Sequence, residues 1–397
     1  MRDLCARCEK GLSAIAEIAR FSERSLDGFQ QNRHFQQMLK ESTSYPDFET
    51  RVETALRELF AQVPSIRVKK VVREYSVQSY EPDLLANITV AGDPHTVVVE
   101  CKNVGQPRIV RTALLQLRDY VSRSGKSMTP LFAAPYLSPQ TREMCREQEV
   151  AYLDLEGNAR FVLDPVFVER TVPTKPLAEK RALRSLFKPK AASVLKTLLR
   201  EPPRPWRVTE LAHAARVSLG HVSSVKARLL DREWAQATGD GLLVSEPGKL
   251  LDAWRNAYEP PAGKRLGFYT TLHGSAFEKV ALTALNAGPR PGRAIFAAQS
   301  AAHWLAPYGR TGTQYFYADV AGLEELRDML KLSSAAKGEN VVVTVPKHED
   351  LLLDTVEPST GALCTGVVQT YLDLTVTGER GREAADHLRA RLLPWTQ

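Results

Sequence analysis

Two acidic residues and one lysine carry the strongest chemical signal in this sequence. Asp83 follows a proline, and Glu100 and Lys102 close the apolar run Val97–Val99. Side chains alternate between the two faces of a β-strand, so Glu100 and Lys102 would emerge on one face and Cys101 on the other. Carboxylates are hard oxygen ligands that suit Mg²⁺ or Mn²⁺, and a lysine beside a phosphate stabilises developing negative charge. The pattern therefore predicts metal-dependent cleavage of a phosphodiester.

The residues around this cluster predict the elements that would hold it. Apolar residues at helical spacing predict helices at Phe48–Phe60, capped near Asp47, and at Ile109–Ser122. Between the two helices, the pattern predicts three strands, with a turn at residues 92–94 between the last two: Val68–Val77, Leu84–Val90 and Thr96–Glu100. Further along we expect strand Pro130–Ala134, helix Ser138–Gln148, and strands Val150–Leu155 and Phe161–Val168. This order predicts an α/β layout with a mixed sheet.

The motif resembles that of the PD-(D/E)xK nuclease superfamily, which has the restriction-endonuclease-like fold. The resemblance implies that Asp83 and Glu100 bind the metal and that Lys102 is catalytic. It also implies that an acid on the preceding helix completes the site. Glu49 and Glu53 lie about one turn apart on that helix, and we favour Glu53 as the third metal-binding and catalytic residue.

The helix after the lysine carries a second pattern. Gln116 and Tyr120 are four residues apart, so they share one helical face. A Gln-x-x-x-Tyr at this place is similar to the motif of RecB-type members of the superfamily, and both residues are catalytic candidates that would reach the phosphate or order the lysine. An active nuclease and an inactive nuclease fold both stay open, because this fold is often reused without activity.

The most basic part of the chain contains a helix-turn-helix pattern. Residues 170–233 contain fifteen Lys and Arg against five Asp and Glu, whereas the whole chain has a net charge of +7. Helices are predicted at Thr209–Ala215 and Leu219–Asp231, and the apolar face of the second is formed by Val222, Val225, Leu229 and Leu230. A turn at 239–241 between two short strands predicts a hairpin. Together these elements predict a winged helix.

The positive charge and the polar outer face of the second helix predict binding to double-stranded DNA. The predicted DNA-binding residues are Arg204, Arg207, Ser218, Gly220, His221, Ser223, Ser224, Lys226 and Arg228. Residues 221–226 would read the bases, and Arg204, Arg207 and Lys226 would hold the phosphate backbone. A solvated basic surface or a module for binding a protein partner is the alternative interpretation.

The last part of the chain predicts an α/β domain. Its expected strands include residues 294–297, 314–319, 340–345 and 367–374, and a helix follows at Arg382–Leu392. The run Val367–Leu374 before Gly381–Ala385 resembles the C-terminal region of the AbiEi-type antitoxin family, and residues 154–159 fit versions that carry a nuclease-like domain. This resemblance implies a transcriptional autorepressor of a bacterial toxin–antitoxin or phage-defence system, with a nucleotidyltransferase-like toxin as partner. The complete nuclease motif departs from a simple antitoxin.

Composition and length set the organisation. We expect a multidomain α+β or α/β chain with a helical segment at 1–45, a nuclease-like domain at 46–170, a winged helix at 171–258 and an α/β domain at 264–397. The five scattered cysteines suit a reducing cytoplasm, and the absence of a long apolar run argues against a membrane span. Cys5 and Cys8 form a lone CxxC, which on an amphipathic helix indicates two small buried residues more than a zinc site.

Three hypotheses follow. In the first, the winged helix directs a Mg²⁺- or Mn²⁺-dependent nuclease domain to DNA in phage defence or toxin–antitoxin control, with a homodimer as a candidate assembly. In the second, the protein is a non-catalytic repressor whose nuclease fold serves only for binding. In the third, it is a scaffold for docking partners.

Overall fold

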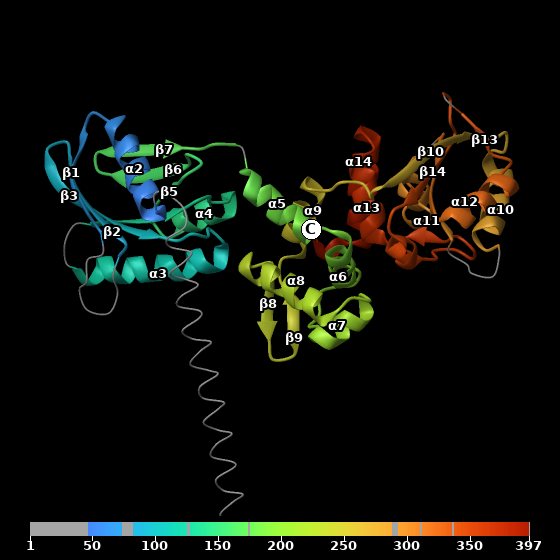
Figure 1. Cartoon of the computed structure of the whole chain (residues 1–397), viewed down its shortest axis with the longest axis horizontal. Coiled ribbons are helices and arrows are strands. Elements are labelled where there is room, and N and C mark those ends of the chain that lie inside the picture. Colours follow the sequence, from blue (N-terminus) through green and yellow to red (C-terminus); the bar gives the residue numbers. More distant parts are fainter. Residues whose placement is uncertain are drawn as a thin grey trace, which may run out of the picture. The chain divides into compact units, whose positions relative to one another are not determined.

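The computed structural model describes residues 47–73, 82–124, 128–173, 175–287, 293–309, 312–335 and 337–396 (Figure 1). The chain divides into two units, Met1–Val63 and Pro64–Gln397. The Cys5–Cys8 pair and the predicted strand residues 74–77 lie outside the described residues. Among the described residues, no helix is both long and apolar enough to cross a membrane.

The described part of the first unit is helix α2, Phe48–Ala61. Its N-terminus is capped by Asp47, whose carboxylate accepts a hydrogen bond from the backbone N–H of Thr50 at 2.8 Å. The residues that repeat at helical spacing are buried: Val52, Leu56, Leu59 and Phe60. The predicted helix and its cap are confirmed.

The second unit begins with a seven-stranded sheet whose strands are ordered as in the sequence, β1 to β7. The pairs β3–β4 and β4–β5 are parallel and the other four are antiparallel, so the sheet is mixed as predicted. The strands are β1 (Ile66–Arg73), β2 (Leu84–Val90), β3 (Asp93–Cys101), β4 (Met128–Ala134), β5 (Ala151–Asp154), β6 (Ala159–Leu163) and β7 (Val166–Arg170). Helices α3 (Pro107–Ser124) and α4 (Pro139–Glu147) connect the parallel strands.

Helices α3 and α4 cover one face of this sheet. Val98, Phe132 and Tyr152 point from three neighbouring strands into a core that Val110, Leu114 and Leu117 of α3 complete. These residues alternate with the side chains of the opposite face, as the period of two requires. The parallel arrangement of β3 and β4 fixes the end of β3 close to the start of α3.

Two turns differ from the expectation. The hairpin between β2 and β3 turns at Ala91 and Gly92, whose φ angles are 54° and 106°, so residues 93 and 94 already belong to β3. Positive φ at both central residues is the requirement of the tight hairpin turn that matches strand twist. The predicted strand 161–168 is also wrong as one element, because it turns at Asp164 and Pro165 and forms β6 and β7.

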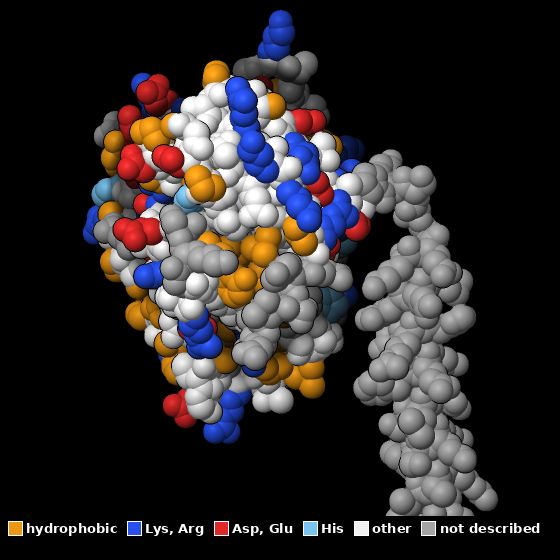
Figure 2. Space-filling view, turned by 90° about the vertical axis from the view of Figure 1, so that its left-hand side faces the viewer, with side chains coloured by type: hydrophobic (Ala, Val, Ile, Leu, Met, Phe, Trp, Pro, Cys, Tyr) orange, Lys and Arg blue, Asp and Glu red, His pale blue; other side chains and the backbone are white. Residues whose placement is uncertain are grey.

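Strand β1 lies at one end of the sheet order and is basic. Four of its exposed residues carry positive charge: Arg67, Lys69, Lys70 and Arg73. Charged side chains on an edge strand disfavour pairing with the edge of another sheet. Figure 2 faces this side of the chain and shows Lys and Arg side chains gathered above an apolar area.

A helical region with one small hairpin follows. Its elements are α5 (Leu177–Leu186), α6 (Pro189–Leu199), α7 (Val208–Ala214), α8 (Leu219–Asp231), β8 (Ala235–Thr238), β9 (Gly241–Val244) and α9 (Pro247–Asn256). Helix α5 begins at Leu177, shortly after β7 ends at Arg170. Ser218 caps α8, and its hydroxyl accepts from the N–H of His221 at 3.4 Å.

The last region contains a second mixed sheet, ordered β13-β10-β14-β12-β11-β16-β15. Its strands are β10 (Gly263–Tyr269), β11 (Ala294–Phe296), β12 (Gln314–Ala318), β13 (Ser333–Ser334), β14 (Val341–Pro346), β15 (Thr355–Val356) and β16 (Cys364–Thr365). Its helices are α10 (Gly274–Leu285), α11 (Ala298–Leu305), α12 (Val320–Met329), α13 (Val367–Thr375), α14 (Glu379–Leu392) and the short turns η1 (Glu349–Leu353) and η2 (Pro394–Thr396).

The predicted strand at 367–374 is helix α13, which corrects the expectation. Residues 368–374 are all buried, so the apolar run shows no exposed face from which a helical period could be read. Tyr371, Leu372 and Leu388 join the core that Val222, Leu229 and other residues of α6 to α9 form. One hydrophobic core therefore connects α13 and α14 to the helical region.

Substitution of Gly241 tests the β8–β9 hairpin. Its φ is 138°, and a Cβ there would lie 2.3 Å from the carbonyl oxygen of Trp206, which accepts from the N–H of Leu242 at 2.9 Å. We expect Gly241→Ala to destabilise the hairpin by about 1–3 kcal/mol, because an L side chain is strained at this φ and the oxygen cannot move without losing its bond. Faster hydrogen exchange at the Leu242 amide would show it.

Gly239→Ala is the matched control, since a Cβ at that position meets nothing within 4 Å. Equal exchange rates at the Leu242 amide in the two variants would contradict the expectation.

Candidate active site and nucleic-acid interface

The antiparallel pairing of β2 and β3 brings Asp83 and Glu100 to one edge of the first sheet. Leu84 is the register partner of Val99. Asp83 and Glu100, the next residues toward this edge, are therefore opposite each other across the strand pair. The N–H of Cys101 donates to Oδ2 of Asp83 at 2.6 Å, which fixes this carboxylate against the end of β3. Side chains directly opposite in an antiparallel pair point to the same face. The two predicted carboxylates therefore lie side by side.

Glu100 and Lys102 form an ion pair on the same side of β3. The Glu100 side chain is only 3% exposed, whereas that of Lys102 is 38% exposed. A buried carboxylate needs a cation or hydrogen-bond donors, since an unpaired buried charge is strongly destabilising. Lys102 supplies the cation at the rim and keeps part of its surface open to solvent.

The pKa of Lys102 reflects these neighbours. Partial burial alone lowers the pKa of this ammonium group, but the hydrogen bond to Glu100 and the negative charges of Glu100 and Asp83 outweigh burial and raise the pKa above its ordinary value. Lys102 is therefore cationic throughout the neutral range. A fixed positive charge at this rim can stabilise negative charge on a phosphate.

Gln116 of α3 borders the same hollow as Lys102. The hollow is lined from this side by Lys102, Thr112 and Gln116, and Gln116 is exposed. Tyr120, one turn further along α3, is half-buried and packs against the core of Val98, Val110 and Leu114. Although Gln116 and Tyr120 are four residues apart on α3, Gln116 borders the hollow and Tyr120 packs against the core.

The donor set of this cluster suits a hard divalent cation. Asp83 and Glu100 offer carboxylate oxygens, and Mg²⁺ is commonly held by one or two carboxylates together with water and substrate phosphate. Among the residues that the structure describes, no group of three His, Cys, Asp or Glu side chains is placed to hold a metal ion. Asp83 and Glu100 offer oxygens of the kind that such a cation takes, and their role as ligands, like that of a third acid, stays a prediction.

Glu53, the predicted third ligand, belongs to the first unit. On α2 it accepts a hydrogen bond from the guanidinium of Arg57 at 2.9 Å, an i,i+4 ion pair on the helix surface. Its role at the metal stays a prediction.

Helix α8 has a buried face and an exposed face, as its sequence predicts. Val222, Val225 and Leu229 are buried, and Leu230 is half-buried. The exposed face includes four of the predicted DNA-binding residues: Gly220, His221, Ser223 and Ser224. Ser218 is exposed as well, and its hydroxyl lies 2.8 Å from Nδ1 of His221. Short side chains on an exposed helix face let the helix backbone approach a groove.

The basic residues that were predicted to contact DNA differ in their exposure and in their partners within the protein. Arg207 is exposed, and Lys226 is half-buried on α8. Arg204 stacks 3.5 Å above the ring of Trp206 and pairs with Glu210 at 2.9 Å, so its charge is partly compensated. Arg228 donates to the hydroxyl of Ser185 at 3.1 Å. Arg204 and Arg228 therefore also have structural contacts within the helical region.

Comparisons with known proteins give limited similarity. No protein-family model matches the chain, and no curated protein matches its sequence. A solved structure described as a repair endonuclease from Pyrococcus abyssi is similar to 29% of this chain and 49% of its own, with 15% identity and a TM-score of 0.22. A structure of an EndoMS–dsDNA complex is similar to 26% of this chain and 44% of its own, with 18% identity and a TM-score of 0.20. The chain spans about half or less of the length of these two proteins.

Sequence reasoning missed a buried polar cluster around Asp373. Its Oδ1 accepts from Nε2 of Gln369 at 2.9 Å and from the hydroxyl of Tyr317 at 3.2 Å, and it also accepts from the hydroxyl of Tyr258. Burial raises the pKa of Asp373 to about 6, although these hydrogen bonds and the charge of Lys196 act in the opposite direction. Gln369 and Asp373 meet because they are four apart on a helix, which the strand interpretation concealed.

The pKa of Lys102 offers a direct test of the ion pair. We expect Glu100→Gln to lower this pKa, because the hydrogen bond from the ammonium to a charged carboxylate and its attraction are lost while the burial of Lys102 stays. A ¹³C NMR titration of the lysine Cε resonances measures the change. The exposed Lys70 of β1 serves as the internal control, and a Lys102 pKa unchanged by the substitution would contradict the pairing.

Proposed function

We propose that this chain binds double-stranded DNA through a winged helix made of α7, α8 and the β8–β9 hairpin, and that it cleaves DNA with Mg²⁺ or Mn²⁺ at Asp83, Glu100 and Lys102. The observation that carries the proposal is the cluster of two carboxylates and a lysine at one sheet edge, of which Lys102 lines the hollow beside α3. The positive charge of residues 170–233 supports nucleic acid as the substrate.

Each residue has a distinct task in this proposal. Asp83 and Glu100 would hold the cation, which when bound supplies Lewis-acid activation of the phosphodiester and of a water molecule. Lys102, cationic at neutral pH, would stabilise negative charge on the phosphate. Gln116 would donate a hydrogen bond to a phosphate oxygen from the wall of the hollow.

A DNA-binding protein without nuclease activity is the second candidate. It is favoured by the positive charge of residues 170–233 and the exposed polar face of α8, which need no metal ion to bind DNA. The regulatory role in toxin–antitoxin or phage-defence control, with a nucleotidyltransferase-like partner, stays a proposal based on the resemblance of residues 367–385. Co-purification of such a partner with the full chain would test it.

Cleavage is tested with supercoiled plasmid, purified full-length protein and Mg²⁺ or Mn²⁺. We expect Asp83→Asn and Lys102→Met to reduce nicking by about 10²–10³-fold, since each removes a charge that acts on the transition state. Asp83→Asn keeps an oxygen that accepts from the N–H of Cys101, so the fold around it is preserved.

The control for cleavage is Asp93→Asn, which neutralises an exposed acid at the opposite end of β3 and should leave nicking unchanged. A wild-type protein that binds DNA but nicks nothing with either metal would reject the nuclease and favour the non-catalytic candidate.

DNA binding through α8 is tested separately. We expect Ser224→Glu to weaken binding to duplex DNA by at least about tenfold, because it places a negative charge on the exposed face of α8. Fluorescence anisotropy with a labelled duplex at low salt measures the affinity. Ser275→Glu makes the same change on the exposed surface of α10 and should bind as the wild type does. Equal affinities of all three proteins would exclude α8 as the reader.

A further inference from the structure

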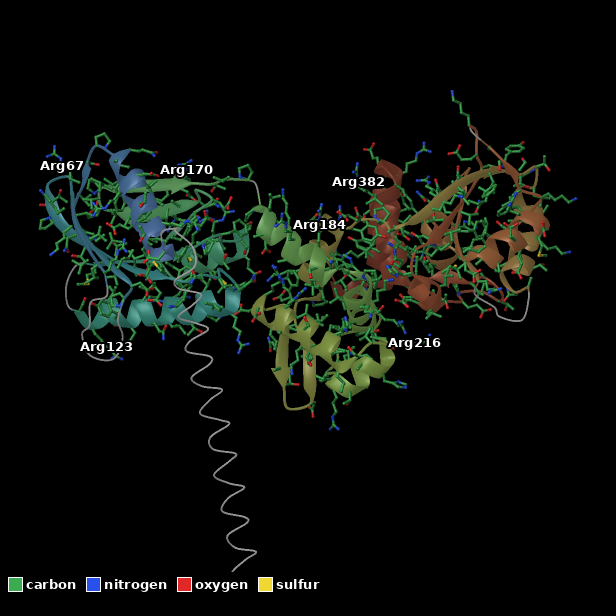
Figure 3. The ribbon with its side chains drawn as sticks, viewed as in Figure 1. Arg67, Arg123, Arg170, Arg184, Arg216 and Arg382 are labelled. Atoms are coloured by element: carbon green, nitrogen blue, oxygen red, sulfur yellow. The ribbon has the colours of Figure 1, made fainter. Side chains whose placement is uncertain are left out.

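A large cleft borders the helical region and the second sheet. Its volume is about 1340 Å³, which is more than a single nucleotide needs. One wall is formed by Ser193 and Lys196 of α6 and by Arg200 directly after this helix, and a second wall is the turn between α7 and α8. Segments 257–262 and 346–354 form the remaining sides. Arg184 and Arg216, labelled in Figure 3, border the cleft from α5 and from the α7–α8 turn.

The cleft is positively charged. Among the described residues that line it, seven are Lys or Arg and three are Asp or Glu. Lys196 and Arg200 share one carboxylate, that of Asp354, at 3.7 Å and 2.8 Å. Lys196 is only 8% exposed, so its charge is held in a poorly solvated place where an anion gains most from it. Asp373 also acts on Lys196, so the excess positive charge of the cleft comes from the other basic residues that line it, among them Lys190.

An aromatic surface adjoins the basic wall. The ring of Phe187 stacks on that of Trp254, with centroids 5.4 Å apart and planes within 3° of parallel. Both residues line the cleft, and Phe187 is half-buried, so part of its ring stays accessible. Basic side chains that suit phosphate and an aromatic ring that suits a planar base thus lie in one cleft.

We propose that this cleft binds a phosphorylated small molecule of nucleotide size, with its phosphates at Lys190, Lys196 and Arg200 and its planar group near Phe187. Ser218 and His221 also line the cleft, and both belong to the first turn of the proposed DNA-reading helix. Occupancy of the cleft would therefore alter the affinity for DNA. This coupling rests on the proposed function, whereas ligand binding does not.

The test is calorimetry of the full-length protein with ATP and with pyrophosphate, in EDTA to keep metal ions away from the carboxylates. We expect ATP to bind at one site per chain and pyrophosphate to bind more weakly. Lys190→Gln and Arg200→Gln should each weaken ATP binding by about tenfold. Phe187→Leu should weaken ATP binding but leave pyrophosphate binding unchanged, because pyrophosphate has no planar group.

Lys279→Gln is the matched control, since it removes one exposed positive charge on α10 and should bind ATP as the wild type does. Lys190 is exposed, so its substitution tests the site even where Arg200→Gln disturbs Asp354 and the fold. Absence of ATP binding up to about 1 mM, or the same loss with Lys279→Gln, would overturn the proposal.

The DNA-binding assay separates ligand binding in the cleft from the effect of that ligand on DNA affinity. Saturating ATP should change duplex affinity several-fold in the anisotropy assay, and an unchanged affinity would reject the coupling. Loss of duplex binding in Lys190→Gln without any ATP binding would make the cleft part of the DNA surface and reject the ligand. ATP binding by a protein that binds no DNA would leave the cleft site standing and reject the proposed DNA reader.

Discussion

The burial of a carboxylate at the end of β3 is the constraint on which the candidate active site depends. Glu100 is 3% exposed, so its charge has to be compensated within the protein, and Lys102 supplies a cation. Along the chain, the period of two gives Glu100 the same-face neighbours Val98 and Lys102, so a cation at position 102 compensates the charge locally. The same period directs Lys102 outward to the rim. The arrangement that stabilises the buried acid thus also places a positive charge where a phosphate can reach it.

Local patterns predicted most of the elements because their signals are local. The boundaries of β2 and α8 agree with the sequence, since alternation and helical spacing are visible within each segment. Residues 367–374 were misread because every position from 368 to 374 is buried by tertiary packing, and burial on all sides removes the periodicity. Residues 161–168 were misread for a different reason, since apolar residues lie on both sides of the turn at Asp164 and Pro165.

The sites differ in how far the sequence could predict them. Asp83, Glu100 and Lys102 come from two adjacent strands, so a correct hairpin is sufficient to bring them together. The large cleft and the Asp373 cluster combine segments from residue 184 to residue 373. No local sequence pattern predicts that residues so far apart in the chain lie close together. A weak signal did exist, because Lys196 interrupts the apolar run 194–199 and a charge within a buried helix requires a partner. Its partner Asp354 is 158 residues away in sequence, which only the fold reveals.

Helix α8 connects the proposed DNA binding with the cleft, because one face of the helix is buried in the core and its N-terminal end borders the cleft. Val222, Val225 and Leu229 are fixed in a core shared with α13, so the body of the helix cannot rotate without breaking close packing. Ser218 and His221 lie before this fixed part, where the hydroxyl and the imidazole form the cap and border the cleft. An anion in the cleft would therefore act on the first turn of α8 and leave the rest in place. Because base-reading residues of such helices concentrate at the N-terminal end, a change confined to that turn is sufficient to alter recognition.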